Sequence, residues 1–333
     1  LLDALGRERG WRRWRWPAVA ATAIAVAIAV IAIRPGRAGA KAAPCDGGAP
    51  ELAAVWSSAV GDRLSQRFAA LATPYAAEVS DRVRAGLDGQ ATTWTRIHRG
   101  ACEAHRRGGV TAATYDRQLA CLRRRLGDLR SAVAVLDQTD AASLASAVDV
   151  VARMAPFEWC ADLDLLAREQ EPPTTPAARA AVDAVRARLS QAEALERGAR
   201  TSEALAEVDA ALATARTLAY PPVVVEAALL KGRIAINVYD DIGAIQPLAD
   251  AEAMALEHGM IAASIIAAAR RIAFEAVADD QDFDGLVRQT AILEPLSRSL
   301  ASDQFARPLL LNNIAMLHLA RGKRDDADRA AQA

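Results

Sequence analysis

The sequence combines one continuous apolar run with long segments in which apolar residues recur at helical spacing. Residues 18–33 carry no charge, and Thr22 is their only polar residue. From residue 51 onward, apolar side chains recur every three or four positions, which places them along one side of an α-helix. The pattern predicts an all-α protein: a single transmembrane helix, a four-helix bundle that bears the cysteines, and an array of helix pairs.

The apolar run predicts a membrane helix over residues 17–33. Its sixteen uncharged residues span about 24 Å as a helix, and the flanking tryptophans extend it into the membrane interface. Five arginines precede the run, and three basic residues follow it before residue 42. This asymmetry places residues 1–16 in the cytoplasm, as a juxtamembrane stub of a single-pass inner-membrane protein, and residues 34–333 in the periplasm. The lipid bilayer is therefore one expected partner.

Two alternatives to a membrane anchor stay open. Ala38-Gly39-Ala40 resembles a signal-peptidase site, so cleavage there would release a free periplasmic repeat adaptor. A buried, alanine-rich core helix is the other alternative, although the collar of tryptophan and arginine fits a membrane helix better.

The remainder of the sequence divides into four parts by composition and periodicity. Glycine, alanine and proline over residues 34–50 indicate a linker, and the Pro-rich stretch 169–177 indicates a hinge. Residues 51–168 predict an extracytoplasmic helical bundle, and residues 178–333 predict a repeat array. Within the bundle the expected helices cover residues 51–71, 75–105, 111–136 and 142–154.

The four cysteines all follow the apolar run and all belong to the first half of the protein. An exported compartment permits disulfides. Antiparallel hairpins would bring Cys45 near Cys102, and Cys121 near Cys160. We therefore favour these two bonds among the three connectivities that four cysteines allow.

Small residues twelve positions apart recur in the second half of the protein, with offsets of 40, 41 and 42 residues between successive pairs. The pairs are Ala192/Ala204, Gly232/Ala244, Ala273/Gly285 and Ala315/Ala327. Small side chains let two antiparallel helices approach closely, and such units must stack to bury their apolar faces. The spacing resembles that of tetratricopeptide repeats in an enlarged form, with about four units and the last one truncated. HEAT-like pairs are the structural alternative.

Composition excludes some partners. The 333 residues are 52% hydrophobic and 5% aromatic, which favours helices, and the formal net charge is −1. This charge gives no general attraction to nucleic acid, so no nucleic-acid partner is expected.

The order of anchor, cysteine-bearing bundle and repeats resembles the C-terminal part of the membrane-anchored serine/threonine protein kinases of myxobacteria. The fragments that carry this resemblance are Cys45 shortly after the anchor, Trp56, Trp94 eight residues before Cys102, the Cys121-Leu122-x-Arg124-Arg125-Leu126 and Cys160-Ala161-Asp162 segments, and Glu226-Ala227-x-Leu229-Leu230-x-Gly232-Arg233. The resemblance implies a role in signal transduction, with any kinase domain upstream of Leu1. The sequence itself contains no kinase motif, because Asp282-Phe283-Asp284-Gly285 is predicted as a turn between repeat helices. We therefore expect no enzymatic activity from it.

Few residues suggest chemistry. His98, Cys102 and His105 have spacing that would suit zinc with Cys45 as a fourth ligand, but a disulfide at Cys102 is the preferred interpretation. Paired carboxylates fall at predicted helix ends, where capping explains them. We predict no catalytic residue, no cofactor and no metal.

Function is therefore expected from surfaces. Stacked helix pairs create a groove for an extended peptide or helix. Amide and guanidinium side chains can bind a peptide backbone or a carboxylate, so the groove candidates are Arg233, Asn237, Asn312 and Asn313. The expected role is a non-catalytic, membrane-anchored sensor or scaffold that binds a protein or peptide partner. The sequence leaves a homodimer open.

Overall fold

A computed structural model describes residues 45–238, 240–276, 282–300 and 305–332. Every regular element among these residues is a helix, which confirms the all-α prediction. The protein divides into two units, Leu1–Asp46 and Gly47–Ala333. The predicted membrane helix, residues 17–33, lies outside the described residues. None of the described helices has the length and hydropathy of a membrane span.

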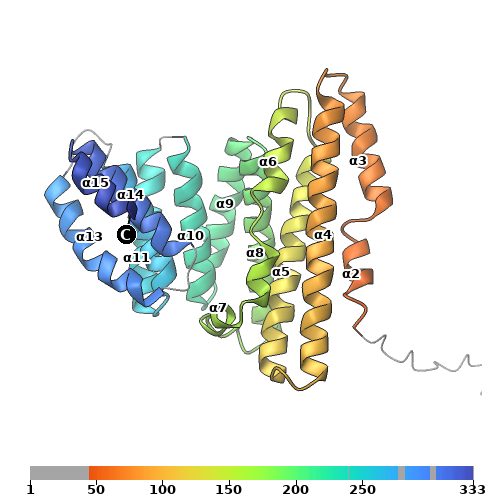
Figure 1. Cartoon of the computed structure of the whole chain (residues 1–333), viewed down its shortest axis with the longest axis horizontal. Coiled ribbons are helices and arrows are strands. Elements are labelled where there is room, and N and C mark those ends of the chain that lie inside the picture. Colours follow the sequence, from red (N-terminus) through yellow and green to blue (C-terminus); the bar gives the residue numbers. More distant parts are fainter. Residues whose placement is uncertain (1–44, 239, 277–281, 301–304, 333) are drawn as a thin grey trace, which may run out of the picture. The chain divides into compact units, whose positions relative to one another are not determined.

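The two long helices α4 and α5 form the centre of the bundle and lie side by side (Figure 1). The elements of this part are α2 (Ala49–Ala53), α3 (Ser58–Ala70), α4 (Ala76–Arg106), α5 (Ala112–Leu136), η1 (Leu144–Ser146), α6 (Ala147–Ala152), η2 (Phe157–Ala161) and α7 (Leu163–Ala167). The Thr111 side chain accepts a hydrogen bond from the Thr114 backbone N–H at 3.1 Å and starts α5. The bounds of α4 and α5 agree with the predictions to within one residue.

Two predicted helices of the bundle are wrong in extent. The helix expected over residues 51–71 is two helices, because Ser57 caps a new start at α3. Trp56 lies in the break and donates a hydrogen bond from Nε1 to Asp88 Oδ1 at 2.7 Å. The helix expected over residues 142–154 begins later, because Ser143 N–H is bonded to Asp140 Oδ1 in a turn.

The second half consists of successive helix pairs. These are α8 (Pro176–Arg197) with α9 (Thr201–Ala215), α10 (Pro221–Ile236) with α11 (Asp241–Glu257), α12 (Ile261–Glu275) with α13 (Phe283–Ser297, followed by η3, Arg298–Leu300), and α14 (Ala306–Ala320) with α15 (Arg324–Gln332). The predicted small residues fall within these pairs. Ala192, Ala204 and Ala244 are completely buried.

Two paired helices, α10 and α11, approach each other closely at Gly232 on α10. A Cβ atom built there would lie 2.4 Å from Leu248 Cγ on α11. Even an alanine would overlap this leucine, so the crossing of α10 and α11 depends on the glycine.

Gly232→Ala should therefore destabilise the fold although alanine favours helices. We expect a loss of about 1–3 kcal/mol from overpacking, measured by urea unfolding. Gly127→Ala on α5 is the matched control, because no atom lies within 4 Å of a Cβ built there. That variant should gain about 0.5–1 kcal/mol. Equal stability of the two variants would contradict the close approach.

Disulfides join elements far apart in the sequence. Cys121 on α5 is bonded to Cys160 in η2, which confirms that predicted pair. Cys45 and Cys102 each form a disulfide as well, and no described cysteine is a free thiol. The predicted zinc alternative therefore loses the thiolate of Cys102.

One apolar core extends from the bundle into the helix pairs. It runs from Val55 to Ala267, and a second cluster packs α12, α13 and α14 together. The predicted hinge, residues 169–177, lies inside the larger unit. Its first seven residues belong to the connection from α7 to α8, and its last two, which begin with Pro176, are the start of α8. Helix α8 packs against α5 as well as α9. Helix α8, the first helix of the array, is thus also part of the bundle.

Candidate functional site

Arg233 and Asn237, two of the predicted groove residues, contact charged side chains of the preceding unit. Arg233 Nη2 lies 3.3 Å from Glu193 Oε1 and 2.8 Å from Glu196 Oε2 on α8. The contact with Glu196 is an ion pair whose angles depart from hydrogen-bond geometry. Asn237 Nδ2 donates to Glu196 Oε1 at 2.9 Å. Both side chains therefore link two successive units.

The other two predicted residues, Asn312 and Asn313, belong to α14 and do not join this cluster in any described contact. Asn313 is buried, and its Nδ2 donates to the Ala269 carbonyl oxygen on α12 at 2.8 Å. Asn312 is exposed and donates to Asn313 Oδ1 at 3.1 Å. Asn313 therefore fastens α14 to α12, and a ligand would have to displace that bond to reach its amide.

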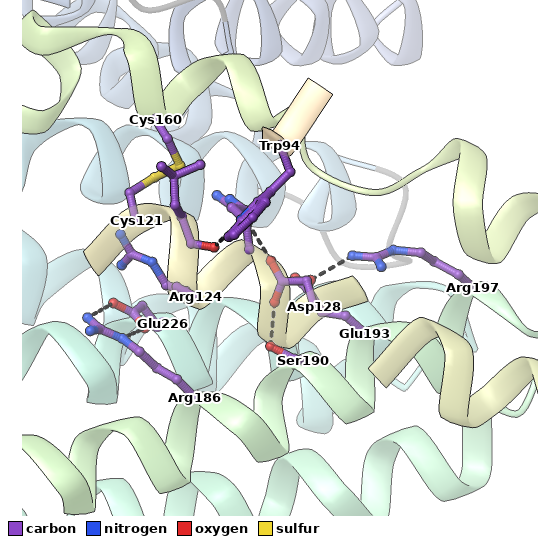
Figure 2. A network of polar contacts seen from close by, with 12 residues as sticks. Trp94, Cys121, Arg124, Asp128, Cys160, Arg186, Ser190, Glu193, Arg197 and Glu226 are labelled. Carbon is purple, nitrogen blue, oxygen red and sulfur yellow. Dashed lines mark hydrogen bonds and ion pairs between the residues drawn. A yellow bond between two sulfur atoms is a disulfide. The ribbon is translucent and has the colours of Figure 1, made fainter. Parts of the chain in front are cut away.

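Arg197 pairs with Glu193, one of the two glutamates of this cluster on α8. Its side chain is 5% exposed, and Nη2 donates to Glu193 Oε2 at 2.7 Å (Figure 2). The two glutamates on α8 are therefore held by Arg197, Arg233 and Asn237. The Glu196 side chain is itself only 4% exposed. Since buried carboxylates are stable only when paired, these partners fix the geometry of the cluster.

Arg270 on α12 is the charged residue that the sequence analysis missed. It is partly buried, and its electrostatic neighbours are Arg233, Glu196 and Glu193. Burial, followed by repulsion from Arg233, lowers the pKa of Arg270 to about 10, although both glutamates oppose the shift. We call Glu193, Glu196, Arg197, Arg233, Asn237 and Arg270 together the α8–α10–α12 face.

The repeat register could have pointed to Arg270. It lies three residues before the small residue Ala273, and the corresponding positions of the other units are Leu189, Leu229 and Asn312. The first two units place leucine there, and Leu189 is buried. A guanidinium at this position breaks the repeat pattern.

A second polar network lies where the bundle meets the array (Figure 2). Asp128 on α5 is 7% exposed, accepts a 2.5 Å hydrogen bond from Ser190 on α8, and pairs with Arg125 at 2.9 Å. Arg186 on α8 pairs with Glu226 on α10 through two hydrogen bonds of 2.9 and 2.7 Å. Burial disfavours the charge of Arg186, but the bonds to Glu226 outweigh it and raise its pKa. These contacts fix α8 between α5 and α10.

The two histidines that were considered as metal ligands, His98 and His105, each stack on an aromatic ring. His98 stacks on Trp94 with ring centroids 4.9 Å apart, and His105 stacks on Tyr115 at 4.6 Å. Within the described ranges, no group of three histidine, cysteine or acidic residues could hold a metal ion.

The α8–α10–α12 face is thus the place where charged and amide groups from three successive units converge. Its groups are guanidinium, carboxylate and amide, which bind ions and hydrogen-bonding ligands. Five of its six residues are ionisable, three arginines and two glutamates, so the face carries one net positive charge. No protein-family model, curated protein or solved structure matches this protein.

Proposed function

We propose that this protein is a non-catalytic sensor or scaffold region that binds a protein or peptide partner through its stacked helix pairs. The observation that carries the proposal is the α8–α10–α12 face, which brings polar groups from three units together. Arg233 has a side chain 26% exposed, and Asn237 is exposed, so a ligand can reach both. Stacked units of this kind create an extended surface, which suits an extended peptide.

We propose further that the pairs are enlarged tetratricopeptide-like units. Support comes from the buried small residues Ala192 and Ala204 and from the close approach at Gly232. The resemblance to the C-terminal part of membrane-anchored serine/threonine kinases supports a role in signalling, with catalysis upstream of Leu1. Binding at the array would then be relayed through α8, which contacts both the array and the bundle.

The proposed location is the periplasmic side of the inner membrane, with residues 17–33 as the anchor. The disulfide between Cys121 and Cys160 supports an oxidising compartment, since cytosolic thiols stay reduced. The arginine asymmetry around the apolar run supports the same orientation.

Site-specific crosslinking tests the proposed binding face. Peptides selected by display on the full-length protein should crosslink to a photoreactive amino acid placed at Asn237 on this face. The matched control is the same amino acid at Gln246, an exposed position on α11. Crosslinking that is equal at both positions, or a selection that enriches no peptide, would contradict the proposal.

A further inference from the structure

Arg270 brings a positive charge to the α8–α10–α12 face that the neighbouring carboxylates do not neutralise. Glu193 is engaged by Arg197 and Arg233, and Glu196 by Arg233 and Asn237. Among the described residues, the interactions of Arg270 are long-range charge effects, with no hydrogen bond or ion pair of its own. The surplus charge of the face therefore resides at Arg270.

A guanidinium at the position of Arg270 lowers the stability of the fold. Leu189 and Leu229 occupy the same register position in the first two units. Leu189 is buried in the apolar core, and Leu229 packs against that core. An unpaired, partly buried guanidinium next to Arg233 loses hydration and meets like charge. A leucine would avoid both costs. Functional sites are where such costs to stability are retained.

We propose that Arg270 is the anchor for a carboxylate group of the bound partner, an inference that rests on the proposed binding function. A carboxylate seated against Arg270 would supply the counter-charge that the face lacks and would reduce the repulsion between Arg270 and Arg233. The planar guanidinium matches a carboxylate through two parallel hydrogen bonds. The group could be the terminal carboxylate of a polypeptide or the side chain of aspartate or glutamate.

Three N-acetylated tripeptide probes separate these sources: trialanine with a free carboxyl terminus, an amidated peptide with a central glutamate, and amidated trialanine as the neutral control. Each is titrated into the full-length protein with ¹⁵N-labelled arginine, at constant ionic strength, and the Nε–Hε resonances are followed. Inorganic phosphate serves as a fourth probe. The resonance missing from the Arg270→Leu spectrum identifies Arg270.

The Arg270 resonance should shift with at least one carboxylate probe and not with the neutral control. Arg270→Leu should weaken binding of that probe about tenfold or more, as expected for the loss of hydrogen bonds to a charged group. Arg270→Lys should bind with intermediate affinity. Arg82→Leu removes the same charge from an exposed site on α4 and should bind as the unmodified protein does.

The midpoint of thermal unfolding distinguishes weaker binding from misfolding. We expect Arg270→Leu to raise this midpoint, whereas a misfolded variant would lower it. The proposal would be overturned if the Arg270 resonance shifted with neither carboxylate probe, or if it shifted with phosphate alone. Selected peptides that crosslink at Asn237 and bind Arg270→Leu unchanged would also overturn it, while leaving the proposed function intact. Binding of small carboxylates without any selected peptide would contradict the proposed function instead.

Discussion

Trp94→Ala is expected to lower the free energy of unfolding by about 3–5 kcal/mol, the usual cost of removing a large buried aromatic side chain. Trp94 lies at the centre of the bundle and is completely buried. Its Nε1 donates to the Leu122 carbonyl oxygen on α5 at 2.9 Å. The ring also contacts Gly48, where an added Cβ would lie 2.4 Å from Trp94 Cη2. The variant would lose packing and a hydrogen bond together.

Two further variants divide this effect into its causes. Trp94→Phe keeps an aromatic ring and loses the donor, so it should cost about 1–3 kcal/mol. Trp159→Ala tests a partly buried tryptophan whose ring lies 5.5 Å from the Arg125 guanidinium. We expect it to cost less than either Trp94 variant. Chemical unfolding monitored by circular dichroism gives all three values, and a Trp94→Ala loss no larger than that of Trp159→Ala would refute the central role of Trp94.

Removing the Cys121–Cys160 disulfide should have the second of the two largest effects. The bond closes a loop with a sequence separation of 39 residues. In the chain-entropy model such a loop restricts the unfolded state enough to stabilise the fold by about 4 kcal/mol. Both cysteines are buried, so the double variant Cys121→Ala/Cys160→Ala would also lose some packing. Its unfolding midpoint in urea should fall accordingly.

Reductant provides the control for this prediction. The unmodified protein should lose stability in dithiothreitol, whereas the double variant should lose less, because one of its disulfides is already absent. The variant Cys45→Ala/Cys102→Ala shows how much of the remaining loss depends on those two cysteines. If Cys121→Ala/Cys160→Ala unfolds at the same urea concentration as the unmodified protein, the bond does not stabilise the fold.

Local periodicity was enough to predict most helices. Apolar residues at helical spacing indicated α4 and α5, because each helix needs one continuous face to bury. Their bounds followed from the cap signal at Thr73-Pro74 and the break at Gly108-Gly109. The break at Ser57 was missed, since a serine cap and a helix-interior serine look alike until Trp56 is seen turned toward Asp88. The Cys121–Cys160 pairing followed from helix order, because consecutive helices pack as neighbours.

The candidate site was predicted only in part. Arg233 and Asn237 were identified by residue type, and both do contact the neighbouring unit. Asn313 was identified by the same criterion, yet it is buried and holds α14 to α12. Residue type does not distinguish a ligand-binding amide from one that joins two helices, because the same donors serve both purposes. Arg270 was missed, since a single arginine in a helix is normally a solvated surface residue.

The sequence by itself determined the helical class, the succession of helix pairs and the positions of their small residues. These features depend on spacing along the sequence, which a helix converts directly into one face. Only the tertiary structure decided that α8 belongs to both the bundle and the array. It also decided that Glu193 and Glu196 have charged partners, whereas Arg270 has no hydrogen bond or ion pair of its own among the described residues. Those properties depend on which helices become neighbours. Burial and charge pairing across helices are set by packing between residues some 40 positions apart, and no local pattern encodes them.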